Sequence, residues 1–182
     1  MKTKKTFLTI IFLATNFLPF QLVKAQFPID AETGQVKFTA VIELPGIAKD
    51  KIYNKAKLWV TSTLKSSDNI IDLSTPDLIV ATGNILLDSI RVSCKTCFAE
   101  NAALNFKFLV FCKDGKYKYS LENFILHYSY VGNTREIGLD KINEVAMGKT
   151  RQAESIVYVK RKIDTLIAYF ISSMKKEENN NW

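Results

Sequence analysis

Two alternating segments joined by a two-residue turn restrict the fold of this 182-residue chain more than any other feature. Leu104–Lys113 and Lys116–Tyr130 carry apolar or aromatic residues at every second position, and Asp114-Gly115 between them is typical of a tight β-hairpin turn. Because such a turn fixes the register of its strands, it places Lys113 opposite Lys116. It also places three apolar cross-strand pairs on one face: Cys112–Tyr117, Val110–Tyr119 and Phe108–Leu121.

The alternation of the second segment shifts by one residue part-way along. After Leu121 the apolar positions resume at Phe124 and continue at Leu126, Tyr128 and Tyr130. One extra residue in a strand restores the apolar face after such a shift. We therefore expect a β-bulge at Glu122-Asn123.

Three further segments have the composition of strands. Gln35–Leu44 alternates strictly and keeps one polar face, which indicates a sheet that is covered on one side only. Asn69–Leu73 is short. Leu78–Leu87 is longer and is expected to continue as Ile90–Cys94, with Gly83 as a weak point or a bulge.

Two segments have a helical period. Lys49–Leu64 and Arg151–Met174 each carry one apolar stripe, and a short helix is expected around Leu139–Ala146. The order is thus strand, helix, four strands and long helix. This order predicts an α+β fold in which two helices cover one face of a five-stranded, mostly antiparallel sheet.

The first 25 residues have the pattern of a signal peptide. A lysine-rich start precedes the apolar stretch Phe7–Phe20, which is too short to span a membrane, and Val23-Lys24-Ala25 suits a signal peptidase. We expect cleavage after Ala25 and export to the periplasm or beyond it. The alternative is that this segment forms a buried amphipathic helix.

The predicted cleavage divides the chain into a signal peptide (1–25), a single α+β domain (26–174) and a polar, disordered tail (175–182). It also changes the charge, because four of the 25 basic residues are removed and 21 remain against 18 acidic ones, a formal charge of +3. We expect no transmembrane segment in the mature chain. A small charge on an exported protein argues against nucleic acid as a partner.

Three stretches resemble a known family. They are Phe27–Asp30 with Thr33–Val36 and Glu43–Gly46, then Lys49–Trp59, then Lys113–Tyr119 followed by Phe124. Over Gln26–Tyr130 the chain is similar to the exported bacterial family called domain of unknown function 4468. The resemblance implies a fold like one repeat of the TATA-binding protein (TBP), and it implies no activity. Ala48 stands where we expect a Ser or Thr helix cap, at a cost of about 1 kcal/mol.

The chain has few residues for catalysis. Cys94 and Cys97 are separated by two residues, so they could form a redox dithiol or a loop disulfide, or be incidental thiols. Cys112 is expected to be a small buried apolar residue. His127, the only histidine, falls on the polar face of its strand. No catalytic set, metal site or cofactor is expected.

The sequence therefore predicts an exported, non-catalytic binding domain of the bacterial cell envelope. Its partner is an envelope protein or a small apolar ligand. The expected contact face is the side of the sheet away from the helices, with Leu109, Phe111, Ile125, Lys107, Lys118 and His127.

Two alternatives stay open. The aromatic stripe of the hairpin could line a cavity under Arg151–Met174 that carries an apolar ligand. Cys94 and Cys97 could act as a thiol redox pair.

Overall fold

The structure is a computed structural model that describes residues 27–64, 73–75, 77–88, 100–130, 132–144 and 149–176. The predicted signal peptide, strand residues 69–72, the extension Ile90–Cys94 and most of the predicted tail lie outside the described residues. The elements follow in the order β1 (Phe38–Glu43), α1 (Lys49–Thr63), β2 (Leu73–Thr75), β3 (Leu78–Leu87), β4 (Glu100–Lys113), β5 (Lys116–Tyr130), β6 (Asn133–Gly138), a 3-10 helix η1 (Leu139–Glu144) and α2 (Lys149–Lys175).

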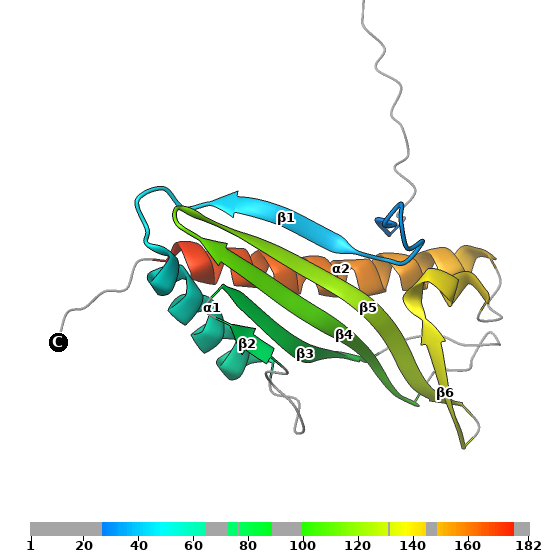
Figure 1. Ribbon diagram of the computed structural model, residues 1–182. Coiled ribbons are helices and arrows are strands. Elements are labelled where there is room, and N and C mark those ends of the chain that lie inside the picture. The colour runs from blue at the N-terminus through cyan, green and yellow to red at the C-terminus, as the bar shows by residue number, and fades with distance from the viewer. Residues whose placement is uncertain are drawn as a thin grey trace, which may run out of the picture.

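The predicted α+β architecture is confirmed. Five strands form one antiparallel sheet in the order β1-β5-β4-β3-β2, and α1 and α2 lie on one side of it (Figure 1). The opposite side, which we call the outer face, has no helix of the described chain over it (Figure 1). The prediction of a sheet covered on one side is thus correct for this part of the chain.

A sixth strand, β6, was not predicted. It pairs with β5 along residues 125–130, whereas β1 pairs with the same edge of β5 along residues 116–121. The sequence of β6, Asn-Thr-Arg-Glu-Ile-Gly, has no apolar alternation, and its first four residues are exposed. Such a strand is held by backbone hydrogen bonds to one neighbour and leaves little trace in the pattern of side chains.

The hairpin of β4 and β5 has the predicted register, including the pairs Lys113–Lys116 and Phe108–Leu121. The predicted bulge is also confirmed. Lys107 pairs with Glu122 and Asn105 with Ile125, so that two residues of β5 face the single residue between them on β4. Asn123 has a left-handed backbone (φ 56°), which is the local adjustment that returns Phe124 to the core.

Some boundaries differ from the predicted ones. β4 begins at Glu100 rather than Leu104, with a second irregularity at Asn101 (φ 51°), and β2 extends to Thr75, which pairs with Leu78. The predicted short helix is the 3-10 helix η1. Gly83 is not a bulge, because the pairing of β3 with β4 runs without a break through it.

The core fills the layer between the sheet and the helices. Inward-pointing side chains of the central hairpin are buried, and they come from both strands: Leu104, Phe106, Phe108, Val110 and Cys112 of β4, and Tyr117, Tyr119, Leu121, Phe124, Leu126 and Tyr128 of β5. Helix side chains complete the layer, among them Ile52, Trp59, Val159, Ile163 and Phe170. The apolar face that the alternation predicted for the hairpin is therefore the core face, as far as its side chains are described; Tyr130 lies outside that set.

The missing cap of α1 is supplied by a distant segment. Ala48 makes no side-chain cap, as expected, but the backbone N–H of Lys49 donates to Oδ1 of Asp114 at 2.8 Å. The same hairpin turn is tied to this loop by two backbone hydrogen bonds, from Gly115 N–H to the Ile47 carbonyl and from Leu44 N–H to the Gly115 carbonyl. Asp114 thus both forms the turn and caps a helix 65 residues away in the sequence.

We expect Asp114→Ala to lower the free energy of unfolding by about 1 kcal/mol, because it removes the acceptor for a helix N-terminal N–H. Asp114→Asn keeps an acceptor oxygen and the turn preference, and should lose less. Urea unfolding of the three proteins measures both effects. If the asparagine variant loses as much stability as the alanine variant, the negative charge of Asp114 accounts for the effect, and its hydrogen bond to α1 does not.

Candidate functional site: the outer face of the sheet

All six predicted contact residues belong to the outer face, because they alternate with the buried residues of β4 and β5. Phe111 is 39% exposed and Lys118 is exposed, while the other four are half-buried: Lys107, Leu109, Ile125 and His127. The structure therefore gives these residues the orientation that the sequence predicted.

An apolar strip crosses the outer face near the tip of the hairpin. Cross-strand pairing puts Val41, Lys118, Phe111 and Leu78 in one row over four strands. The next row contains Leu109 and Val80, and Val80 is only 6% exposed although it points away from the helices. Val41, which is 55% exposed, is the most accessible apolar side chain of the strip.

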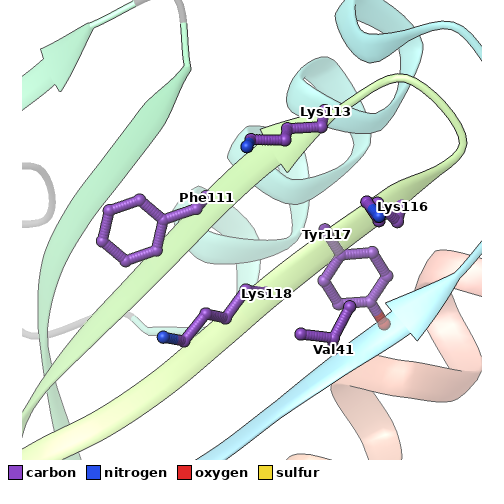
Figure 2. A pocket seen from close by; sticks show the side chains of 6 residues that line it. All are labelled: Val41, Phe111, Lys113, Lys116, Tyr117 and Lys118. Atoms are coloured by element: carbon purple, nitrogen blue, oxygen red, sulfur yellow. The ribbon is translucent and has the colours of Figure 1, made fainter.

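A groove of about 340 Å³ lies at the end of this strip. Its lining comes from three strands, β1, β4 and β5: Val41, Phe111, Lys113, Lys116, Tyr117 and Lys118 (Figure 2). Three of these six residues are lysines, because the hairpin register sets Lys113 opposite Lys116 and Lys118 opposite Phe111. Val41, Lys113 and Lys116 were not among the predicted contact residues, although the Lys-Asp-Gly-Lys turn already places two lysines side by side.

The lysines of the groove have no acidic partner among the described residues. No carboxylate of that part of the chain lies within 4.0 Å of the ammonium group of Lys113, Lys116 or Lys118. Glu43 is the cross-strand neighbour of Lys116, but it stays beyond that distance. Like charges directly opposite each other on a sheet are unfavourable, so the groove is a site of uncompensated positive charge.

A second cavity, of about 410 Å³, lies beside β1 and differs in its electrostatics. It is lined by Asp30, Lys37 and five other residues: Pro28, Ile29, Phe38, Thr39 and Tyr119. Lys37 lies 3.3 Å from Asp30 and 3.6 Å from Glu122. Hydrogen bonds from Thr33, together with Lys37, lower the pKa of Asp30, and Asp30 in turn raises the pKa of Lys37. The charges of this cavity are satisfied within the protein.

His127 belongs to a polar ladder across the other end of the outer face. Its Nδ1 lies 2.9 Å from Glu136 Oε1, and its Nε2 lies 3.1 Å from Asn105 Nδ2. Asn84 Nδ2 donates to Asn105 Oδ1 at 3.0 Å and extends the ladder to β3. An imidazole with both nitrogens engaged is poorly placed for general base catalysis. The sequence could not show this ladder, because Glu136 lies on the unpredicted strand β6.

Cysteine chemistry has little support in the described residues. Cys112 is 1% exposed, and burial raises the pKa of its thiol to about 11, so it is protonated at neutral pH. Cys94 and Cys97 lie outside the described residues. Within the described part of the chain, no group of three or more His, Cys, Asp or Glu side chains could hold a metal ion.

The layer under α2 is closely packed where it is described. Phe170 of α2 contacts four aromatic rings there, with centroid distances from 4.8 to 6.1 Å: Trp59, Phe108, Tyr117 and Tyr119. Burial raises the pKa of the Tyr117 hydroxyl. The groove at the hairpin tip and the second cavity lie elsewhere, on the outer face and beside β1.

Residues 38–127 match the family model described as a domain of unknown function (DUF4468) with TBP-like fold. These residues are a DUF4468 domain. The segment begins with β1 and ends within β5, at residue 127, so it includes the whole apolar strip of the outer face. The family resemblance seen in the sequence is therefore correct.

Two solved structures have the same fold as this chain. A DUF4468 family protein from Bacteroides ovatus ATCC 8483 is 17% identical with a TM-score of 0.62, and the match covers 87% of this chain and 95% of that one. A TBP-like protein from Parabacteroides distasonis ATCC 8503 is 12% identical with a TM-score of 0.64, covering 82% and 98%. A comparison with curated proteins found no significant match. No helix in the described residues is long and apolar enough to cross a membrane.

Proposed function

We propose that this chain is an exported, non-catalytic binding domain of the bacterial cell envelope that contacts its partner through the outer face. The observation that carries the proposal is the exposure of Val41 (55%) and Phe111 (39%) in one row of an uncovered sheet, beside lysines without acidic partners in the described chain. Export is supported by the lysine-rich, apolar and small-residue pattern of residues 1–25.

The arrangement of these side chains favours a binding surface over the chance exposure of single apolar residues. Single apolar residues are common on protein surfaces and need no explanation. Here Val41 and Phe111 flank Lys118 on adjoining strands, and the half-buried Leu109 continues the apolar area along β4. A contiguous apolar area rimmed by charge is typical of a binding surface.

The alternative of a carrier with a cavity under α2 is less well supported. The rings that were expected to line such a cavity contact Phe170 and one another. The outer face, in contrast, combines exposed apolar groups with a groove.

Photo-crosslinking in the producing bacterium tests the proposal. With p-benzoylphenylalanine in place of Phe111, we expect an adduct in the periplasmic fraction or the culture medium whose protein part begins at Gln26. The matched control places the same group at Leu58, which is 68% exposed on α1. The Lys118→Glu change should weaken the adduct from position 111. Equal adducts from positions 58 and 111, or an adduct that keeps residues 1–25, would contradict the proposal.

A further inference from the structure

We propose that the groove at the hairpin tip binds an amphiphilic anion, a single apolar chain that ends in a carboxylate or a similar anionic group. This inference deepens the proposed function, since the groove is part of the outer face. Its ligand is a small molecule whose anionic group contacts lysines of the lining, Lys113, Lys116 and Lys118, and whose apolar chain contacts Phe111 and Val41. Figure 2 shows these side chains around the groove.

The charges of the groove call for an anion. Four other lysines of the described chain have a carboxylate within 4.0 Å, for example Lys37 with Asp30, and Lys49 with Asp77 at 2.6 Å, whereas Lys57 and other single surface lysines have none. The groove differs from these because three such lysines line one cavity. The three groove lysines are not neutralised within that part of the chain, and two of them face each other across the hairpin. A bound carboxylate relieves this repulsion and accepts charge-assisted hydrogen bonds from the ammonium groups.

The remaining lining calls for an apolar group. Phe111 and Val41 are too exposed to serve the core, and the alkyl stems of the lysines add apolar surface below their charged ends. Leu109 lies two residues from Phe111 on the same face of β4, roughly 7 Å further from the hairpin tip. A chain whose head lies among the lysines therefore passes over Phe111 towards Leu109.

The size of the groove favours a small ligand. At about 340 Å³ it lies at the lower end of the range for small-molecule sites, which is roughly 300–1,000 Å³. A protein partner commonly buries about 800 Å² of surface on each side, which is far more surface than the six side chains lining this groove present. We therefore assign the groove to one amphiphile.

Titration with sodium decanoate, below the concentration at which it forms micelles, tests this assignment. The sample is the ¹⁵N-labelled protein in the form that the cell produces after any cleavage, and its amide signals are followed by NMR. We expect shifts of the amides of Val41, Phe111 and residues 113–118, weaker binding at high salt, and no comparable shifts with decyltrimethylammonium, which has the same chain and the opposite charge. Shifts that are absent from the groove, or equal for both amphiphiles, would overturn it.

Variants separate the effect of the groove from that of net charge. Lys118→Glu should weaken decanoate binding at least about tenfold, because it removes one charged partner and adds a repulsive charge. Lys57→Glu makes the same change of charge at an exposed position of α1, on the other side of the sheet and outside the groove lining, and should leave the affinity within about twofold. Equal losses for the two variants would reduce the effect to net charge and refute the site.

The outcome is distinguishable from that of the proposed function. Decanoate binding with no adduct from position 111 supports the groove and contradicts the envelope contact. An adduct from position 111 without decanoate binding supports the envelope contact and contradicts the assignment of the groove. Binding to phosphatidylglycerol vesicles without decanoate binding would overturn the assignment in favour of a membrane surface, and a stable dimer that covers Phe111 would overturn it in favour of a second copy.

Discussion

Replacing Phe170 with alanine should lower the free energy of unfolding by about 3–5 kcal/mol, the largest effect that we expect from a single change. The Phe170 side chain is 1% exposed, and its ring centroid lies 4.8 Å from that of Trp59 and 5.0 Å from that of Phe108. Tyr117 and Tyr119 complete the surroundings. These rings come from α1, β4 and β5, so they cannot all move into the space that the phenyl ring leaves. The cost therefore includes a cavity as well as the lost transfer free energy.

Tyr169 provides the matched control for this change. It is the neighbouring aromatic residue of α2, but it is 55% exposed, and in the described chain its ring contact is a tilted pair with Trp59 at 5.9 Å. Tyr169→Ala should lose about 1 kcal/mol or less. Urea unfolding of both variants and of the parent chain gives the comparison. Losses of similar size would mean that Phe170 does not join α2 to the sheet as described.

The local parts of the fold were predictable from the sequence. Alternation indicated the strands of the central hairpin, and the two-residue turn fixed their register and thereby the side chains of the outer face. The β-bulge followed because a single shift in the alternation has one simple geometric remedy. In each case the information lies within a short stretch of the chain.

The contacts between distant segments were not predictable. Asp114 caps α1 from 65 residues away, and nothing in the local sequence of either segment indicates this hydrogen bond. The groove needs the pairing of β1 with β5, which brings Val41 beside Lys118. Strand β6 and the Glu136 contact of His127 were missed for a different reason, because a polar strand paired along a single edge carries no periodic signal.

Gly83 shows why a glycine in a strand has two physical explanations. The sequence suggested a weak point or a bulge, whereas the structure places Gly83 in regular pairing opposite Phe106, whose ring lies across it. A Cβ atom at this position would lie 2.6 Å from Cε2 of Phe106 and closer still to Cζ. The glycine therefore makes room for a ring. The register of β3 with β4 decides between the explanations, and no short turn fixes that register.

We expect Gly83→Ala to lower the free energy of unfolding by about 1–3 kcal/mol, because the methyl group overlaps a ring that cannot move freely. Phe106 is 2% exposed, and its ring packs against that of Phe124 with centroids 5.8 Å apart. The measurement is urea unfolding of the parent chain and of the alanine variant.

A double-mutant cycle with Phe106→Leu identifies the cause of that loss. Leucine lacks the ring atoms that meet the new methyl group, so adding Gly83→Ala to this variant should cost little. It could add up to about 1 kcal/mol of stability, because alanine restricts the unfolded chain more than glycine does. The two changes should therefore couple by about 1–4 kcal/mol. If Gly83→Ala costs the same in the parent chain and in the Phe106→Leu variant, the ring is not the cause, and the backbone at Gly83 is what requires glycine.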